Sequence, residues 1–380
     1  MTVDLDPLRP RLAALGRPVL PGDVAAAMRD SGQLVSDTSV MAATEALRRE
    51  STGAGPLESL LRTEGVTDVL VNGAGPVWID AGRGLEQTSV RLRNESEVRR
   101  LAQRLAASAG RRLDDAHPYV DARMAEGTRL HAVLGTLSDP GTCLSLRVPT
   151  TTAMTLADWV SVGSLPAAGA QVLQQLIAAR IPFLITGGTG SGKTTLLATL
   201  LGLVPPDQRL IIVEDSRELR PEHPHCIRLE GRPRNAEGAG LITLTDLVRQ
   251  ALRMRPDRLV LGEVRGAELC DLLTALNTGH EGGCGTVHAN SPADLPARLE
   301  ALAALGGMGR EALHAQVAAA LQVVVHVQRD ADRRRRVGEI CVLGRDPDGL
   351  VRTERACEFT ADGRILRGAG IVTLERLLAR

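Results

Sequence analysis

Aromatic side chains are almost absent from the sequence. Only five of its 380 residues are aromatic: Trp78, Trp159, Tyr119, Phe183 and Phe359. Proteins that bind single-stranded nucleic acid stack the bases on rows of aromatic side chains, and five scattered residues cannot supply such a row. A net charge is missing as well, because 45 basic side chains balance 45 acidic ones, whereas nucleic-acid binders usually carry a basic excess. We therefore expect no direct contact with nucleic acid.

Long apolar runs and paired cysteines are also missing. No stretch approaches the roughly 20 apolar residues that a membrane-spanning helix needs, and the first residues, MTVDLDPLRPRL, lack the apolar centre of a signal peptide. The six cysteines form no CxxC pair, which argues against a zinc knuckle and is typical of reduced thiols in the cytosol. We expect a cytoplasmic protein that meets the inner face of the cytoplasmic membrane only peripherally, through partners.

The length allows about two domains at roughly 150 residues each. We expect an N-terminal helical segment over residues 1–50, a first domain over residues 57–149, a linker over residues 150–164 and a second domain over residues 165–380. Residues 51–56, Ser-Thr-Gly-Ala-Gly-Pro, have the composition of a connection between folded parts.

The two domains differ in their hydrophobic patterns. In the first, residues 66–73 and 77–80 predict a β-hairpin, and residues 95–109 predict an amphipathic helix. These features, with further strands over residues 129–137 and 142–148, predict a small α+β domain. In the second, short apolar strands at residues 183–186, 209–213 and 258–262 alternate with helical segments. This alternation is typical of an α/β fold with a parallel sheet and helices on both faces.

A glycine-rich loop follows the apolar strand at residues 183–186. Its sequence fits the pattern G-x-x-x-x-G-K-[ST] and precedes a helix predicted over residues 194–203. Glycines let successive backbone N–H groups face one point, and the helix N-terminus adds partial positive charge there. We expect Lys193 to reach the β- and γ-phosphates and the Thr194 hydroxyl to bind Mg²⁺. The residues expected to bind the nucleotide are Gly187, Gly188, Thr189, Gly190, Ser191, Gly192, Lys193, Thr194 and Thr195.

Acidic residues follow two other predicted strands. Glu214 and Asp215 come directly after residues 209–213, and Glu263 follows residues 258–262. The carboxyl ends of parallel strands line the ligand crevice of an open sheet, so these carboxylates are candidates to orient the attacking water. We expect Asp215 to bind Mg²⁺, directly or through a water. A solvated acidic pair at a strand end is an equal alternative for Glu214 and Asp215 taken alone.

Two histidines lie in the next glycine-rich segment. His280 and His288 flank Gly282, Gly283 and Gly285, and hydrogen bonds from their rings could contact the γ-phosphate. Two residues are too few for a metal site of their own.

Taken together, these motifs resemble the secretion-superfamily ATPases of type II and type IV secretion systems, nearest to the CpaF-like branch of tight-adherence (Flp) pilus ATPases. The resemblance covers about residues 60–300. It rests on a Walker A box at residues 187–194, an Asp box at 212–219, a Walker B box at 252–266 and a His box at 278–291, with upstream matches at residues 121–124, 127–129 and 146–147. The tetracysteine zinc motif of many type II secretion ATPases is absent.

The resemblance implies a PAS-like N-terminal domain, a linker and a RecA-like motor domain, with six subunits in a ring and ATP between the two domains. It implies that Glu263 is the general base or positions the water, that Glu214 assists it, and that His288 senses the γ-phosphate. Arg123, Arg129 and Arg147 match basic residues that contact the nucleotide from the N-terminal domain, in cis or in trans. Ordinary surface salt bridges are the alternative for these arginines.

We therefore expect an ATPase that uses ATP and Mg²⁺ to drive pilus assembly or protein secretion through an inner-membrane platform protein. A DNA-transfer translocase and an inactive nucleotide-binding scaffold are the alternatives. The basic run at residues 333–336 is expected in a solvated turn of a hairpin between residues 323–327 and 337–343, with contact to acidic lipid heads as the alternative.

Overall fold

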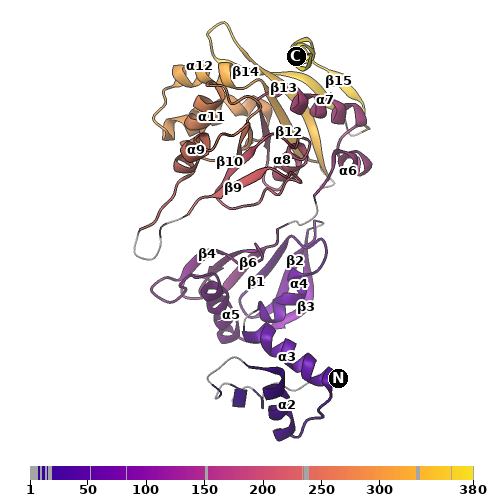
Figure 1. Ribbon diagram of the computed structural model, residues 1–380, viewed down its shortest axis with the longest axis vertical. Helices are drawn as coiled ribbons and strands as arrows, with labels where there is room; N and C mark the ends of the chain where they lie inside the picture. Colours follow the sequence, from indigo (N-terminus) through magenta and orange to yellow (C-terminus); the bar gives the residue numbers. More distant parts are fainter. Residues whose placement is uncertain are drawn as a thin grey trace. The chain divides into compact units, whose positions relative to one another are not determined.

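The computed structural model describes residues 7–8, 11–12, 15, 19–51, 53–82, 84–149, 153–232, 234, 239–330, 334–360 and 362–379. The chain forms two compact units, Met1–Thr150 and Thr151–Arg380, which Figure 1 shows in indigo to magenta and in magenta to yellow. Each unit is described on its own. Among the described residues, no helix combines the length and apolar character needed to cross a bilayer.

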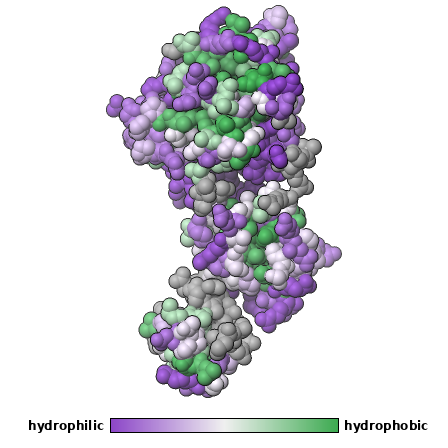
Figure 2. Space-filling model, turned by 90° about the vertical axis from the view of Figure 1, so that its right-hand side faces the viewer, coloured by the Kyte–Doolittle hydropathy of each residue, from purple (hydrophilic) through white to green (hydrophobic). Residues whose placement is uncertain are grey.

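Two helices open the first unit. α2 spans Pro21–Asp30 and α3 spans Asp37–Ser51, and Val24 and Met28 of α2 pack against Ala43 of α3 in a small core. α2 ends where Gly32 takes a positive φ of 71°, a conformation that favours glycine. Hydrophobic side chains remain exposed on these helices and their connection, including Leu34 at 79% and Met41 at 67%, and Figure 2 shows green residues among the hydrophilic ones in this region.

The rest of the first unit is a six-stranded antiparallel sheet in the order β3-β2-β1-β6-β5-β4. Helix α5, Glu95–Ser108, buries Val98, Leu101 and Leu105 in the core of this unit. The strands are β1 Asp68–Asn72, β2 Gly75–Asp80, β3 Leu85–Leu92, β4 Tyr119–Arg123, β5 Arg129–Val133 and β6 Cys143–Arg147, and the short helices are η1 Gly55–Leu57 and α4 Glu58–Leu61. This arrangement confirms the predicted α+β character. The predicted connection at residues 51–56 is partly packed, because Ala54 is buried in the same core.

The second unit is built on a nine-stranded sheet in the order β15-β14-β13-β12-β7-β11-β10-β8-β9. The six strands from β12 to β9 run parallel, and β13, β14 and β15 extend the sheet antiparallel. The strands are β7 Phe183–Gly187, β8 Leu210–Glu214, β9 Cys226–Glu230, β10 Arg258–Val264, β11 Cys284–His288, β12 Val323–Arg329, β13 Arg335–Arg345, β14 Val351–Phe359 and β15 Ile365–Arg367. The predicted parallel sheet is therefore only part of a mixed sheet, because short connections can join neighbouring strands only in antiparallel fashion.

Helices cover both faces of this sheet, as the sequence predicted. Phe183 and Ile185 of β7 point into one core, and Leu184 points into the other, as the alternation of side chains along a strand requires. The first core is covered by α6 Leu156–Ser161, α7 Ala167–Ala178, α8 Lys193–Leu201 and α13 Ile371–Leu378. The second is covered by α9 Leu244–Leu252, α10 Glu268–Leu276, α11 Leu295–Leu305 and α12 Arg310–Ala320, with η2 Pro292–Asp294 before α11.

Much of the predicted linker belongs to the second unit. α6 lies within residues 150–164, and its Trp159 is buried in the core of this unit. Trp159 Nε1 donates to Thr199 Oγ1 of α8 at 3.1 Å, and Thr199 Oγ1 donates to the carbonyl of Met154 at 2.7 Å. These bonds fix the chain before α6 to α8.

The predicted hairpin is confirmed for its described residues, but the basic run does not all lie in a solvated turn, because Arg335 and Arg336 belong to β13 and the Arg336 side chain is only 19% exposed. β12 and β13 pair antiparallel, with Arg329 opposite Arg335. Arg336 bonds to Asp330 across the turn at 2.6 and 2.8 Å. Arg333 lies outside the described residues.

Candidate functional site

The glycine-rich loop joins β7 to α8 at the carboxyl edge of the parallel strands. β7 is buried throughout, and Gly187, Gly190 and Gly192 have positive φ values of 154°, 68° and 103°. A Cβ on Gly187 would lie 2.2 Å from the carbonyl oxygen of Val327, so only glycine fits there. The sequence thus specifies a tight strand-to-helix turn at the start of α8.

Lys193 lies beneath this turn. Its side chain is 8% exposed, and Nζ donates to the carbonyls of Gly187 at 3.0 Å and Gly188 at 2.9 Å. Burial lowers the pKa of this ammonium group, and the charge of Glu263 opposes that shift. A buried cation is costly unless it is paired, so an anion at the loop would be a better partner than two carbonyls.

The first turn of α8 adds further polar groups to the loop. Thr194 and Thr195 are partly buried there, and the N-terminus of a helix favours negative charge. The hydroxyl of Ser191 is buried and has no hydrogen-bond partner in the structure. The loop therefore holds an unsatisfied polar group next to the Lys193 ammonium, as expected for an anion site.

Glu214 ends β8 and is 3% exposed. Its Oε1 accepts hydrogen bonds from the backbone N–H groups of Glu218 at 3.0 Å and Leu219 at 2.9 Å, and Oε2 has no partner. Burial raises the pKa of this carboxyl to about 7, although the two N–H groups oppose the shift. Glu214 is therefore a buried carboxyl with a raised pKa at the end of β8, and the alternative of a solvated acidic pair is wrong for it.

Arg265, which is not among the predicted site residues, pairs with the carboxylates of both Glu263 and Asp215. Arg265 Nε donates to Glu263 Oε2 at 2.9 Å, and its Nη1 lies 3.5 Å from Asp215 Oδ2. Glu263 follows Gly262, which faces Glu214 on the neighbouring strand. The three predicted acidic residues thus lie together at the ends of β8 and β10. Sequence reasoning could have found Arg265 only from its place two residues after Glu263.

The two histidines lie at opposite ends of β11. His288 ends the strand beside Gly187, and its Nε2 lies 3.1 Å from Thr189 Oγ1 of the loop. His280 precedes the strand and bonds to the carbonyl of Ala275 at 3.2 Å. The whole of β11 separates it from the loop, so its position contradicts the predicted contact with a nucleotide. Proximity in sequence misled the prediction because a parallel strand carries the chain from one edge of the sheet to the other.

The three predicted arginines lie side by side across neighbouring strands of the first unit's sheet. Arg123 pairs with Arg129 across β4 and β5, and Arg129 pairs with Arg147 across β5 and β6. Arg129 bonds to Asp121 at 2.9 and 3.2 Å, and Arg147 lies 3.4 Å from Asp68. The row concentrates cationic side chains at one end of the sheet, and the predicted salt bridges are present at two of its members.

Three further residues approach the loop from distant parts of the second unit. Arg329 Nη2 lies 3.6 Å from the point that a Cβ on Gly190 would occupy. Trp159 Cη2 and Arg335 Cδ lie equally far, 3.6 Å, from the corresponding point on Gly192. Arg329 and Arg335 reach the loop because β12 pairs with β7 and with β13, and Trp159 reaches it because α6 packs against α8, which no local motif indicates.

The donors at this edge fit a magnesium nucleotide better than a protein-bound metal. Within the described part of the chain, no group of three or more His, Cys, Asp or Glu residues could hold a metal ion. Mg²⁺ is usually bound by one or two side chains together with substrate phosphates. Thr194, Asp215 and Glu263 offer such donors, and the Lys193 ammonium and unsatisfied Ser191 hydroxyl suit the phosphates.

The fold is similar to that of a solved protein structure. The structure resembles the ATPase DotB of Legionella pneumophila with a TM-score of 0.53 and 22% identity, over 75% of this chain and 78% of that one. The chain is thus a mixed α/β protein that shares its fold with this ATPase.

Its sequence defines the family. Residues 50–374 match the model of the Type II/IV secretion system protein family. The chain is 55% identical over 325 residues to the "Putative conjugal transfer protein Rv3659c" of Mycobacterium tuberculosis, covering 84% of this chain and 92% of that protein. It is 31% identical over 314 residues to the "Type IV secretion system protein PtlH" of Bordetella pertussis, covering 75% and 92%. The chain belongs to the type II/IV secretion system protein family.

Proposed function

We propose that this protein hydrolyses ATP with Mg²⁺ and uses the energy to drive a secretion or pilus-assembly machine. One observation carries the proposal: the buried Lys193 ammonium lies at a glycine-rich strand-to-helix turn, close enough to Glu263 of β10 for that charge to oppose the lowering of its pKa by burial. Binding of phosphates there lets Lys193 exchange two carbonyl partners for charged oxygens. Charge-assisted hydrogen bonds are roughly twice as strong as neutral ones, which favours the bound state.

In this proposal the residues divide the work of phosphoryl transfer. Backbone N–H groups of residues 187–195 and Lys193 bind the phosphates, while Thr194 and Asp215 hold Mg²⁺, which neutralises charge on the phosphate oxygens. Glu263 orients the attacking water and accepts its proton. Since Arg265 now neutralises Glu263, this ion pair must loosen before Glu263 can act. His288, which lies beside Thr189, contacts the γ-phosphate. Glu214, which faces Gly262 on the neighbouring strand, assists Glu263.

At the level of the machine, we propose a homohexamer in the cytoplasm that works on an inner-membrane platform protein, in the manner of tight-adherence pilus ATPases. The row of Arg123, Arg129 and Arg147 would meet the nucleotide from the first unit, in cis or in trans. An arginine that reaches the developing charge can accelerate phosphoryl transfer by about 10³–10⁵. The similarity to PtlH, named as a type IV secretion system protein, supports this role.

A conjugal-transfer role is the second candidate. The 55% identity to a relative named as a putative conjugal transfer protein favours it. The balanced charge and the five aromatic residues weigh against direct contact with DNA. ATPase activity that rises on addition of DNA would favour this second candidate over the first.

Replacing Glu263 tests the proposed reaction. Glu263→Gln removes the proton acceptor while keeping the size of the side chain, so we expect ATP to bind and turnover to fall at least about tenfold. A matched control is Glu311→Gln, an exposed glutamate in the first turn of α12 outside the motifs, which should leave the rate unchanged. Equal rates for the wild type and Glu263→Gln would refute the role of Glu263, and failure of the wild type to bind ATP would refute the proposal as a whole.

A further inference from the structure

The strand that carries Glu263 is irregular near its carboxyl end. The register of β10 against β11 shifts between Leu261 and Val264, so that two residues of β10, Gly262 and Glu263, lie opposite one residue of β11, Thr286. Two residues against one make a β-bulge, which bends the strand and can turn a side chain in a new direction. The remaining residues of β10 are buried, whereas the side chain of Glu263 is 29% exposed.

Thr286 holds this bulge to β11 through its side chain. Its hydroxyl donates to the carbonyl of Gly262 at 2.6 Å, and the residue is 1% exposed. The bond thus reinforces the pairing of the two strands where the backbone ladder is disrupted. The Gly262 carbonyl and the N–H of Glu263 belong to one planar peptide group, so the bond also fixes the backbone from which the Glu263 side chain projects.

Gly262 is constrained from the other neighbouring strand as well. A Cβ at this position would lie 2.5 Å from Cγ of Glu214 on β8. The Gly262 peptide therefore lies between the Glu214 side chain on one side and the Thr286 hydroxyl on the other. Of these two contacts, only the second is a hydrogen bond to the peptide group itself.

The same end of β11 also reaches the glycine-rich loop. Side chains two residues apart point to the same face of a strand, so Thr286 and His288 share a face, while Val287 between them is buried in the core on the other face. His288 Nε2 lies 3.1 Å from Thr189 Oγ1 of the loop. Since β11 lies between β7 and β10 in the sheet, its end connects the loop with the backbone that carries Glu263.

We infer that Thr286 is a positioning residue, which holds the Gly262 carbonyl and thereby directs the Glu263 carboxylate toward the attacking water. The inference rests on the proposed function, in which Glu263 accepts a proton from that water. Loss of the hydroxyl leaves the loop and Lys193 intact, so the nucleotide still binds. The carboxylate is then misplaced, and a displacement of about 1 Å can slow a reaction by roughly 10².

Steady-state ATP hydrolysis and calorimetric titration with Mg·ADP test this role in the full chain. Thr286→Val keeps the shape of the side chain without its hydroxyl, so kcat should fall at least about tenfold. The Kd for ADP should change by no more than about twofold, because the phosphate-binding groups are unaffected. Thr286→Ala removes the hydroxyl with a smaller side chain and should show the same split. Thr286→Ser restores the hydroxyl and should recover kcat to within about threefold of the wild type.

A double variant tests whether Thr286 acts through Glu263. If it does, adding Thr286→Val to Glu263→Gln should lower kcat by no more than about twofold further, because the group being positioned is already lost. A hydroxyl that only stabilises the fold would instead lower kcat by a similar factor in both backgrounds.

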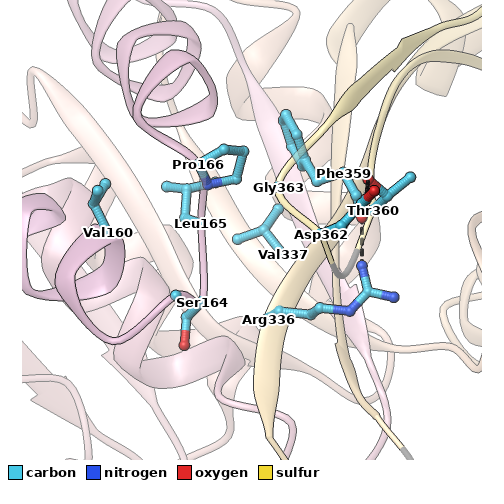
Figure 3. A pocket seen from close by; sticks show the side chains of 11 residues that line it. Val160, Ser164, Leu165, Pro166, Arg336, Val337, Phe359, Thr360, Asp362 and Gly363 are labelled. Carbon is cyan, nitrogen blue, oxygen red and sulfur yellow. Dashed lines mark hydrogen bonds between the residues drawn. The ribbon is translucent and has the colours of Figure 1, made fainter.

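Thr360→Val is the matched control. The Thr360 hydroxyl also donates to a backbone carbonyl of the same unit, that of Arg364, at 3.0 Å. Figure 3 shows Thr360 beside a pocket of about 340 Å³ whose walls come from the α6–α7 turn, β13 and the segment that follows β14. None of the described residues that line this pocket belongs to β10, β11 or the loop, so Thr360→Val should leave kcat unchanged.

The remaining outcomes separate this inference from the proposed function. Wild-type kcat in Thr286→Val and Thr286→Ala would overturn the inference alone, and so would a loss that Thr286→Ser does not recover. A loss of ADP affinity as large as the loss of kcat would overturn it too, since the hydroxyl would then support the whole site. A wild type that neither binds nor hydrolyses ATP would overturn the proposed function, and the inference with it.

Discussion

Glu214 lies next to Asp215 in the sequence, which indicates an exposed acidic pair, but in the structure its carboxyl group is buried. Its pKa is raised from 4.5 to about 7 because the side chain is buried at the end of β8. The folded chain therefore holds this proton more tightly than the unfolded chain. The resulting stabilisation is complete below pH 4.5 and is lost as the pH rises through about 7.

The raised pKa of Glu214 predicts that the protein becomes less stable as the pH rises. Replacing Glu214 should weaken this pH dependence. Between pH 5.5 and 8.5 the unfolding temperature of the wild type should fall, since the part of the pKa difference within this range, from pH 5.5 to about 7, corresponds to roughly 2 kcal/mol. Glu214→Gln cannot ionise and keeps an oxygen for the N–H groups of Glu218 and Leu219, so its unfolding temperature should fall less. The two proteins should differ most at pH 8.5.

The control for this experiment is Glu230→Gln. Glu230 ends the neighbouring strand β9, is 25% exposed and pairs with Arg217, so the variant removes a charge from the same edge without emptying a buried position. If Glu214→Gln and Glu230→Gln follow the same pH profile as the wild type, Glu214 is not the titrating group.

Single residues also mark the limit of what the sequence could predict. The loop from Gly187 to Thr194 was recognisable because its chemistry is contiguous in the chain. The Arg265 ion pair with Glu263 and the burial of Glu214 depend on how β8 and β10 pair, and His280 was misplaced for the same reason. Residues that meet through the sheet carry no local pattern.

At the scale of elements, the close approach of β8 and β10 depends on Gly262. A Cβ at this position would lie 2.5 Å from Glu214 Cγ and 3.0 Å from Glu214 Oε1. Gly262→Ala must therefore displace the Glu214 side chain or push the two strands apart. Overpacking of this kind typically costs about 1–3 kcal/mol, and we expect urea unfolding to show a loss of that size.

Gly344→Ala provides a matched comparison for Gly262→Ala. Gly344 also lies in a strand of the same sheet, β13, but nothing lies within 4 Å of the position of its Cβ. The unfolding free energy of the Gly344→Ala variant should differ from that of the wild type by no more than about 0.5 kcal/mol. Similar losses in both variants would show that the contact with Glu214 is not what requires glycine at position 262.

The elements themselves were only partly predictable. Residues 183–186 and 258–262 read as strands because they are apolar and bounded by turns. The order of the strands and the antiparallel extension by β13, β14 and β15 are set by packing between distant segments. For the same reason the contacts of Trp159 and Arg335 with the loop could not be foreseen.

At the scale of the whole molecule, the proposed ring predicts a defined mass. Light scattering coupled to gel filtration should give six times the chain mass of 40.3 kDa in the presence of Mg·ATP, with Glu263→Gln as the variant that retains ATP. Assembly that depends on nucleotide should disappear for Lys193→Ala, because the loop then lacks its cation. A monomer under all conditions would contradict the hexamer and leave nucleotide binding to be tested separately.

The attachment of Met154 to Thr199 has a consequence for how force could leave the second unit. Thr199 lies on α8, the helix that begins at the loop, and Met154 lies on the chain that leads back toward the first unit. This hydrogen bond is partly buried, and leaving a buried polar group without its partner costs about 1–3 kcal/mol, so the bond favours movement of Met154 together with α8. Under the proposed function, a movement of α8 on phosphate cleavage would therefore reach Met154 through a single hydrogen bond.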